Sequence, residues 1–253
     1  MGVLEKILTQ KQRELDALAA RELPAPPPRR PVALARRRGE PLRLIAEIKL
    51  RSPSAGALSC ELSVAERARA YERAGASMIS VLTDSEFFAG AWEHLGEARS
   101  ATSLPILCKE FVIDERQLDA ARAYGADAVL LIVRCLAAER VPALIAAAAA
   151  RDLVPLVEVA THDEARLALD AGAKLVGVNV RDLDSLDMNP ERARRVLASL
   201  PSWAAAVHLS GLGDPDAVAK VADSRASAAL IGEALMRQAD PLPLLAAMRD
   251  RAG

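Results

Sequence analysis

The segment LPILCKEFVIDERQLDAARAYGADAVLLIV, residues 104–133, contains the pattern that decides the fold. A short apolar run at residues 105–107 precedes a charged segment of helical spacing at 116–124, and a second apolar run follows at 128–133. The tripeptide Tyr-Gly-Ala at 124–126 places a glycine where the helix would end and the chain would turn back. Strands with near-continuous hydrophobicity are buried on both faces, as in parallel sheets covered by helices. The segment therefore predicts one strand–helix–strand unit of a parallel sheet.

The same unit recurs along the chain from residue 42 onward. We expect strands at residues 42–48, 77–82, 105–107, 128–133, 154–159, 175–180, 205–209 and 228–231, and helices at 63–74, 116–124, 137–151, 161–171, 189–200, 215–222 and 241–251. Strand–helix units of roughly 26 residues fit a closed (β/α)8 barrel, an α/β fold, better than an open doubly wound sheet. The open sheet stays the alternative, although no G-x-G-x-x-G motif follows the first expected strand.

The chain before the first strand has two parts. Residues 1 to about 20 carry apolar side chains at helical spacing, and such an amphipathic helix needs a surface to cover. Prolines and arginines dominate residues 24–31, where we expect an extended, solvated spacer. We therefore expect residues 1–40 to pack on a barrel of residues 41–253 within one domain, with the extra N-terminal helix as a lid or plug on a barrel opening.

The composition favours a small-molecule partner. The chain has 253 residues, 33 basic and 34 acidic, with a net charge of −1. It is long enough to bury a large core, and its charge balance does not favour nucleic acid or an anionic membrane as a partner. We see no signal-peptide pattern and no apolar run of the roughly 18 residues that a membrane span needs. Cys60, Cys108 and Cys135 lack metal-ligand spacing, which suits buried thiols in a reducing cytoplasm.

Lysine is scarce in this chain. The six lysines among the 33 basic residues are Lys6, Lys11, Lys49, Lys109, Lys174 and Lys220. A desolvated ammonium group can lose its proton near neutral pH, whereas a guanidinium group cannot. Lys49 and Lys109 follow expected strands, where acid–base chemistry would explain the choice of lysine. At the other four positions we expect plain charge, which an arginine would supply equally well.

Polar side chains cluster at the expected carboxyl ends of strands, where barrel enzymes carry their chemistry. Residues two apart on a strand point to the same side, so two pairs of these side chains are cofacial. For any single residue a salt bridge that closes the barrel end is an equal alternative. Removing charged side chains from water is costly, however. Several charged side chains at neighbouring strand ends, all pointing into one space, therefore favour an active site. The residues are Glu47, Lys49, Lys109, Glu158, Asn179 and Arg181.

Glycine-containing loops follow the last two expected strands, LSGLGD at 209–214 and LIGEALMR at 230–237. Backbone N–H groups near glycines and helix N-termini bind anions, and this part of the barrel recurrently binds phosphate. Plain turns into capped helices are the alternative. The loop at residues 50–56, with Ser52 and Ser54, is expected to close over a substrate. No metal or nucleotide motif is present, so we expect no metal and no cofactor.

Together these motifs resemble the indole-3-glycerol phosphate synthase family, barrel enzymes of tryptophan biosynthesis with an extra N-terminal helix. The resemblance rests on EIKLRSPSAG (47–56), SVLTDSEFFAG (80–90), LPILCKEFVID (104–114), LVEV (156–159), GVNVRDL (177–183), LSGLGD (209–214) and LIGEALMR (230–237). It implies a cofactor-free carboxy-lyase reaction. In that reaction 1-(2-carboxyphenylamino)-1-deoxyribulose 5-phosphate closes a ring and loses CO2 and water, giving indole-3-glycerol phosphate.

The resemblance also implies roles for the charged residues at the strand ends. Lys109 would be the general acid that protonates the substrate carbonyl during ring closure. Lys49 would bind the anthranilate carboxylate and act as an acid in the dehydration. Glu158 would stabilise the cationic intermediate and act as a base, with Glu47 as a second carboxylate.

The remaining implied roles concern positioning and binding. Asn179 and Arg181 would position Glu47 and the substrate hydroxyls. The expected phosphate ligands are Ser52, Ser210, and the backbone N–H groups of Gly211, Gly232 and Glu233, whose side chain must point away from the anion. The expected apolar wall for the aromatic ring contains Phe111 and Leu230, joined by Phe87 and Phe88, for which core packing is an equal alternative.

The chain departs from the family pattern at a few positions. Leu209 stands where the family usually has a glutamate, which removes a carboxylate from the floor of the site. Two alternatives to synthase activity therefore stay open: a paralogue acting on another phosphorylated aromatic compound, and a non-catalytic phosphate-binding barrel. We expect a cytoplasmic monomer or weak dimer whose partners are other tryptophan-pathway enzymes.

Overall fold

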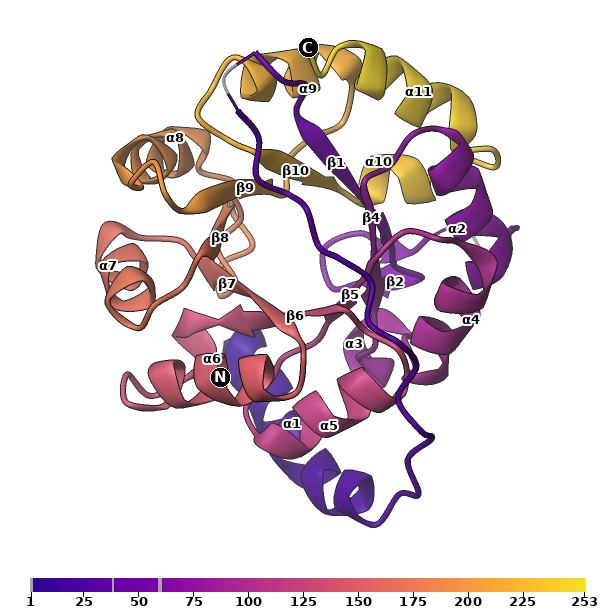
Figure 1. Ribbon diagram of the computed structural model, residues 1–253, viewed down its shortest axis with the longest axis vertical. Helices are drawn as coiled ribbons and strands as arrows, with labels where there is room; N and C mark the ends of the chain where they lie inside the picture. Colours follow the sequence, from indigo (N-terminus) through magenta and orange to yellow (C-terminus); the bar gives the residue numbers. More distant parts are fainter. Residues whose placement is uncertain (1, 38, 59–60) are drawn as a thin grey trace.

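Eight parallel strands form a closed barrel in the computed structural model, which describes residues 2–37, 39–58 and 61–253 (Figure 1). The strands pair in chain order, and the last closes against the first. The expected (β/α)8 barrel is confirmed, and the open sheet is excluded. Cys60 lies outside the described residues. The barrel strands are β1 (Arg43–Ile48), β4 (Met78–Leu82), β5 (Ile106–Lys109), β6 (Ala128–Ile132), β7 (Val154–Val159), β8 (Leu175–Asn179), β9 (Ala205–Leu209) and β10 (Ala228–Ile231).

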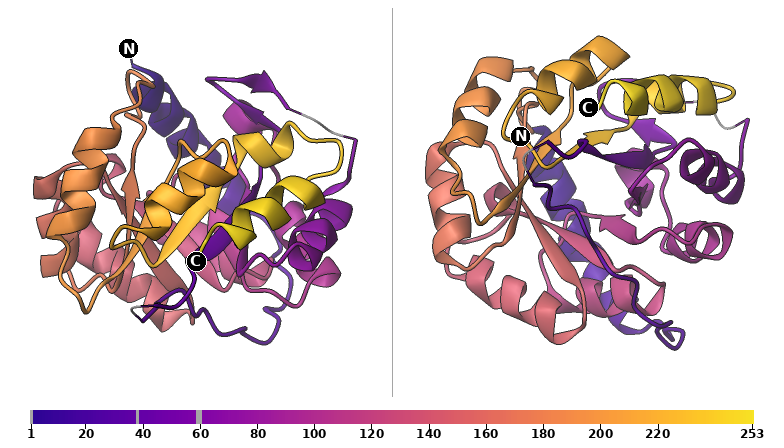
Figure 2. Two further views of the ribbon diagram at one scale, coloured as in Figure 1. Left: turned by 90° about the horizontal axis from the view of Figure 1, so that it is seen from above. Right: turned by 45° about the horizontal axis from the view of Figure 1, so that its top comes forward.

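Helices cover the outside of this barrel (Figures 1 and 2). The longer ones are α2 (Val64–Arg73), α4 (Glu93–Ala101), α5 (Glu115–Ala123), α6 (Arg140–Ala150), α7 (His162–Asp170), α8 (Pro190–Ser199), α9 (Pro215–Ala222) and α11 (Leu242–Asp250). Short helical turns are α3 (Ser85–Phe88), α10 (Glu233–Met236) and the 3-10 turn η1 (Val133–Cys135). The sequence did not predict α3, α4, α10 or η1.

The helix boundaries follow from local chemistry. Ser63 and Asp114 cap α2 and α5, and in both cases the third helical residue bonds back to the cap. Such reciprocal bonds satisfy donors that a helix start would otherwise leave unpaired. At the other end, glycine turns like the one expected at Gly125 have positive φ, namely +90° at Gly75, +100° at Gly125 and +88° at Gly172. These turns return the chain to the sheet.

The alternating directions of strand side chains create two apolar layers. One layer lies between the barrel and its helices and includes Ile48, Ile79 and Val157. The other fills the barrel interior and includes Ile45, Leu107 and Leu156, among others. The interior layer extends to the N-terminal helix, which places that helix at one opening of the barrel.

Helix α1 (Val3–Ala19) covers the end of the barrel at which the strands finish. Its buried side chains Leu4, Ile7, Lys11 and Leu15 form one stripe. In the right-hand view of Figure 2 the helix is visible behind the barrel opening, while the following spacer passes in front. The expectation of a plain charge at Lys11 is therefore wrong, because this side chain lies on the buried face of α1.

The spacer, residues 24–37, crosses the opposite end of the barrel (Figure 1). Residues 24–31 are mostly exposed, as expected of a solvated spacer, but the half-buried side chains of Arg30 and Arg36 are anchored. Arg30 donates from its backbone N–H to Asp127 at 2.7 Å and from its guanidinium to Leu104 O at 2.8 Å. Arg36 donates to Ala222 O at 2.6 Å. Leu104 lies just before β5 and Ala222 is the last residue of α9, where backbone carbonyl groups need donors. Arg38 lies outside the described residues.

Within the described part of the chain, no helix combines the length and the apolar character that a bilayer crossing requires.

Candidate active site

A cavity opens at the carboxyl end of the barrel. Side chains from all eight barrel strands or the loops directly after them line it, together with α1. The six polar residues predicted from the strand ends all line this one cavity, namely Glu47, Lys49, Lys109, Glu158, Asn179 and Arg181. The structure therefore brings together the whole polar set that the sequence placed at strand ends.

Lys109, Glu158 and Asn179 form a chain of contacts across three strands. The Lys109 Nζ lies 3.6 Å from Glu158 Oε2, and Asn179 Nδ2 donates to Glu158 Oε1 at 2.8 Å. Glu158 is 2% exposed, so its carboxylate is held between an ammonium group and an amide with little water. This arrangement keeps a proton donor and a buried carboxylate side by side at the wall of the cavity.

The partner of Asn179 differs from the implied one. Asn179 binds Glu158, whereas the resemblance implied that it positions Glu47. The reason is topological, because β8 pairs directly with β7, while β9 and β10 separate β8 from β1.

Glu47 and Lys49 form a second ion pair, with Lys49 Nζ 3.0 Å from Glu47 Oε1. The period-two alternation places both side chains on the same side, as expected. A glycine makes room for this carboxylate, since a Cβ at Gly232 would lie 2.5 Å from Glu47 Oε1. Any larger residue at position 232 would displace Glu47.

Arg181 belongs to the loop after β8. Its backbone N–H donates to Asn179 Oδ1 at 2.9 Å, and its Nη1 donates to Leu186 O at 2.9 Å. Asp182 holds the same loop by accepting from the N–H groups of Asp184 and Ser185. The loop therefore has internal bonds that fix the guanidinium beside the cavity.

A second cavity adjoins the first and shares Glu47, Lys49 and Arg181 with it. Its remaining lining comes mostly from the two segments expected to bind phosphate, residues 209–214 and 230–237. Four of the predicted phosphate ligands are here, namely Ser210, Gly211, Gly232 and Glu233. The Glu233 carboxylate pairs with Arg237 at 2.8 Å, one turn along α10. These groups offer backbone donors and cations to an anion.

Ser52, the fifth predicted ligand, is placed differently. The loop after β1 folds into a small hairpin of β2 (Arg51–Ser52) and β3 (Gly56–Ala57). Ser52 lines the first cavity and accepts the N–H of Ala55 at 3.1 Å, whereas Ser54 lines both cavities. Of these two serines, Ser54 but not Ser52 lines the cavity of the glycine loops.

Apolar side chains form the rest of the first cavity. Phe88 and Phe111 line it with ring centroids 5.9 Å apart, and Leu230 lines it too. Phe87 is not among the lining residues and packs against the interior core instead. Leu209 is 2% exposed and also faces the cavity. The cavity therefore combines charged groups with a wall suited to an aromatic ring.

The sequence did not predict several lining residues. Val3, Leu4 and Ile7 reach the cavity from α1, and Leu183 and Leu186 reach it from the loop after β8. The helical spacing of the first three was a usable signal, but nothing in the sequence specified which surface they cover. The two loop leucines carry no periodic signal.

Cys135 lies close enough to the Lys109–Glu158 pair to be affected by its charges. Burial and the Glu158 carboxylate raise the pKa of the Cys135 thiol. Among residues 2–37, 39–58 and 61–253, no group of three or more His, Cys, Asp or Glu side chains is arranged to hold a metal ion.

Comparisons with known proteins show which family this chain matches. A model of the family "Indole-3-glycerol phosphate synthase" matches residues 3–247. Indole-3-glycerol phosphate synthase of Exiguobacterium sp. is 40% identical over 97% of this chain and 95% of the relative. Its counterpart from Roseiflexus sp. is 43% identical over 94% of each chain.

Solved structures of other barrels resemble the chain in fold. Thiamine phosphate pyrophosphorylase from Pyrococcus furiosus aligns with a TM-score of 0.64 and 18% identity, over 83% of this chain and 95% of that one. 3-Hexulose-6-phosphate synthase from Salmonella typhimurium aligns with a TM-score of 0.65 and 16% identity, over 83% and 98%. At such identities the likeness concerns the fold alone.

Proposed function

Because the chain belongs to the indole-3-glycerol phosphate synthase family and has that family's carboxy-lyase activity, we propose a role in the reaction for each charged side chain of the cavity. The reaction converts 1-(2-carboxyphenylamino)-1-deoxyribulose 5-phosphate into indole-3-glycerol phosphate, CO2 and water. It needs proton donors, a base, a phosphate site and a place for an aromatic ring. The roles below assign these needs to residues.

Lys109 is the general acid of ring closure. As the ring carbon that bears the carboxylate attacks the substrate carbonyl carbon, the carbonyl oxygen takes a proton from the Lys109 ammonium group. The buried Glu158 carboxylate, 3.6 Å away, keeps that ammonium at the wall of the cavity. Asn179 holds the other oxygen of Glu158 and so fixes the direction of the pair. This contact chain is the observation that carries the assignment.

Decarboxylation and dehydration follow ring closure. The closed intermediate carries a positive charge, which the Glu158 carboxylate stabilises in a site with little water. CO2 leaves as its bond to the ring carbon breaks, and the electron pair of that bond neutralises the cation. The hydroxyl then leaves as water with a proton from Lys49, while Glu158 takes a proton from the ring. Glu47 keeps Lys49 in place at 3.0 Å.

The second cavity binds the phosphate. Ser210, Gly211, Gly232 and Glu233 line this space, and the ligands we assign are the Ser210 hydroxyl and the backbone N–H groups of the other three residues. We assign a contribution to Ser54 beside Ser52, because Ser54 lines both cavities. Phe88, Phe111 and Leu230 contact the aromatic ring.

Formation of fluorescent indole-3-glycerol phosphate from the open-chain substrate tests the reaction, measured with purified protein between pH 6 and 9. A barrel that only binds phosphate would give no product at any pH. Rescue of a synthase-deficient tryptophan auxotroph by this chain would show that the rate suffices in a cell.

We also propose that the protein is a cytoplasmic monomer or weak dimer that exchanges substrate and product with other enzymes of tryptophan biosynthesis. Of the described large apolar side chains, only Met188 and Trp203 are exposed, which favours a monomer because stable interfaces have apolar centres. Light scattering on the purified protein tests this, and a stable larger assembly would contradict it.

A further inference from the structure

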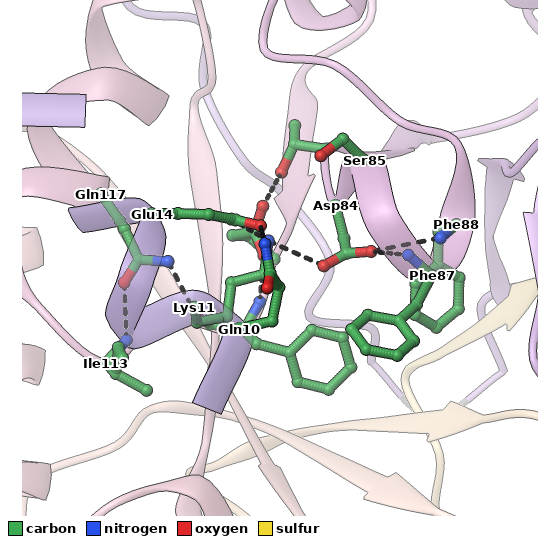
Figure 3. Close-up of polar contacts among 12 residues, drawn as sticks. Gln10, Lys11, Glu14, Asp84, Ser85, Phe87, Phe88, Ile113 and Gln117 are labelled. Carbon is green, nitrogen blue, oxygen red and sulfur yellow. Dashed lines mark hydrogen bonds and ion pairs between the residues drawn. The ribbon is translucent and has the colours of Figure 1, made fainter. Parts of the chain in front are cut away.

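Lys11 is a lysine buried at the boundary between α1 and the barrel. Its side chain is 3% exposed, although it lies on a helix whose opposite face is charged. The Nζ lies 2.8 Å from Glu14 Oε2, 2.7 Å from Asp84 Oδ2 and 3.1 Å from Glu110 Oε1. Figure 3 shows Lys11 between Glu14 of its own helix and Asp84. None of the roles assigned above uses this ion cluster.

Asp84 connects Lys11 to one aromatic side of the cavity. Its Oδ2 binds the ammonium group, while its Oδ1 accepts the backbone N–H groups of Phe87 at 2.6 Å and Phe88 at 3.1 Å (Figure 3). Asp84 is therefore the N-cap of α3, and α3 carries the Phe88 ring that lines the cavity. A shift of the Asp84 carboxylate would shift that ring.

Glu110 connects Lys11 to the other aromatic side. Its Oε1, which contacts the ammonium group, also accepts the N–H of Phe111 at 2.8 Å. Its Oε2 accepts a hydrogen bond of 2.7 Å from the hydroxyl of Thr83, which directly precedes Asp84. One ammonium group thus joins the backbone segments that carry Phe88 and Phe111, whose rings are 5.9 Å apart.

Helix α1 also contributes side chains directly to the cavity. Leu4 and Ile7 line the cavity, and Lys11 follows Ile7 by one helical turn on the same face. The position of these two apolar side chains therefore depends on where Lys11 is held.

The charges make the cluster sensitive to loss of the cation. Asp84 is 0% exposed and Glu110 is 2% exposed, so neither carboxylate can turn to water. Burial alone would lower the pKa of Lys11, but Glu110 and Asp84 raise it, so the side chain stays an ammonium group. Burial raises the pKa of Glu110, and Lys11 opposes that rise. Without Lys11, two buried carboxylates would face each other across the α1 boundary and would separate, take up a proton or admit water.

We propose that Lys11 is a positioning residue for the reaction: its ammonium group joins Asp84 to Glu110 and thereby holds α1, Phe88 and Phe111 in the arrangement that receives the aromatic ring of the substrate. The inference rests on the proposed role of the two phenylalanines. It does not depend on which group is the general acid, and it concerns the aromatic end of the site, separate from the phosphate cavity.

The test compares Lys11→Met with Lys6→Met, the same change at an exposed position of the same helix. For each folded variant we measure KM and kcat for the open-chain substrate, and the constant for competitive inhibition by inorganic phosphate. We expect Lys11→Met to raise KM about tenfold or more with a change of less than about twofold in phosphate inhibition. Lys11→Arg restores the charge and should recover part of the lost KM. Lys6→Met should match the wild type.

A second variant keeps the test decisive if Lys11→Met does not fold. Asp84→Asn preserves a good N-cap for α3 and removes only the charge that Lys11 binds. It should also raise KM and leave phosphate inhibition unchanged. The proposal is overturned if the folded variants keep a wild-type KM. It is also overturned if phosphate inhibition weakens in parallel with KM, because that result indicates general loss of structure. A wrong assignment of Lys109 would instead leave kcat unchanged in Lys109→Ala and would not alter this comparison.

Discussion

The proton donor of ring closure can be tested at a single residue, Lys109. Lys109→Ala removes the ammonium group and leaves both cavities otherwise intact. We expect kcat to fall by about 10² to 10⁴, the usual contribution of general acid catalysis, with KM little changed. Product fluorescence under saturating substrate measures kcat. Lys220→Ala, on the exposed face of α9, is the matched control, and an unchanged kcat in Lys109→Ala would refute the assignment.

A substitution at Leu209 tests whether activity depends on the glutamate that the family usually has at this position. The side chain packs opposite a glycine, since a Cβ at Gly177 would lie 2.6 Å from Leu209 Cδ1. Apolar side chains of the barrel interior pack around it, and it also lines the cavity that contains Lys49 and Lys109. We expect Leu209→Glu to lower the free energy of unfolding by about 2 kcal/mol, because a carboxylate would be buried in the space that the leucine side chain fills. We also expect kcat to fall.

Urea denaturation and product fluorescence measure the two effects of Leu209→Glu. Leu209→Met conserves volume and should cost less than about 1.5 kcal/mol. A Leu209→Glu protein that is stable and turns over faster than the wild type would support the alternative of a different phosphorylated aromatic substrate.

Single residues differ in how far the sequence predicts them. Glu47, Lys49, Lys109 and Glu158 were predictable because strand ends and period-two alternation specify where such side chains point. The bond from Asn179 to Glu158 was not, because it depends on which strands are neighbours in the barrel. The sequence does contain a signal for the buried position of Lys11, namely its helical spacing from the apolar residues Ile7 and Leu15. The carboxylates that Lys11 meets come from distant segments, so its partners could not be predicted.

At the scale of elements, the loop after β8 depends on one carboxylate. Asp182 accepts two backbone N–H groups of the loop, and its other oxygen lies 2.9 Å from the Nη1 of Arg134. The hydrogen bond from Arg134 is the main cause that lowers the pKa of Asp182 to about 2, aided by the N–H groups of Asp184 and Ser185. This loop supplies Arg181 to the cavity, so its stability affects the site.

Asp182→Asn should therefore lower the free energy of unfolding at pH 7 by about 1 kcal/mol, a value reduced for partial solvent screening. The folded-state pKa lies below the unfolded value of about 3.9. The contribution is thus complete above about pH 4 and is lost as the pH falls toward 2. Urea denaturation at pH 7, 5 and 3 checks this. Asp163→Asn, in an exposed pair with Arg166, should show almost no effect, and an equal loss at all three pH values would contradict the prediction.

The elements themselves were predictable where their pattern was strong. All eight barrel strands were predicted to within two residues at each end, because buried parallel strands form continuous apolar runs. Helix α4 was missed because only Leu95 and Ala98 of its side chains are buried, and Gly96 interrupts it. The hairpin of β2 and β3 and the single turn of α10 are too short to show a period. Tertiary contacts define them, such as the bonds from Arg51 to the backbone of α3.

At the scale of the whole molecule, the first 37 residues contact both ends of the barrel. Helix α1 contributes to the cavity at the carboxyl ends of the strands, and the spacer is anchored at the amino ends through Arg30 and Arg36. Asp127 has no exposed surface and accepts both the backbone of Arg30 and the guanidinium of Arg99. The N-terminal segment therefore cannot separate from the barrel without breaking the buried ion pairs of Lys11 at one end and the hydrogen bonds of Arg30 and Arg36 at the other.

We accordingly predict that residues 1–40 and the barrel unfold as one cooperative unit. Trp92 reports on the boundary, because its ring stacks on Tyr124 with centroids 6.5 Å apart and Arg21, just after α1, lies over the same Tyr124 ring at 5.3 Å. Trp203→Phe removes the other indole, which is 60% exposed and should cost little stability. In that variant, urea unfolding followed by Trp92 fluorescence and by far-ultraviolet circular dichroism should give coincident transitions. A fluorescence transition at lower urea than the loss of helical signal would show instead that the N-terminal segment detaches first and is a separate unit.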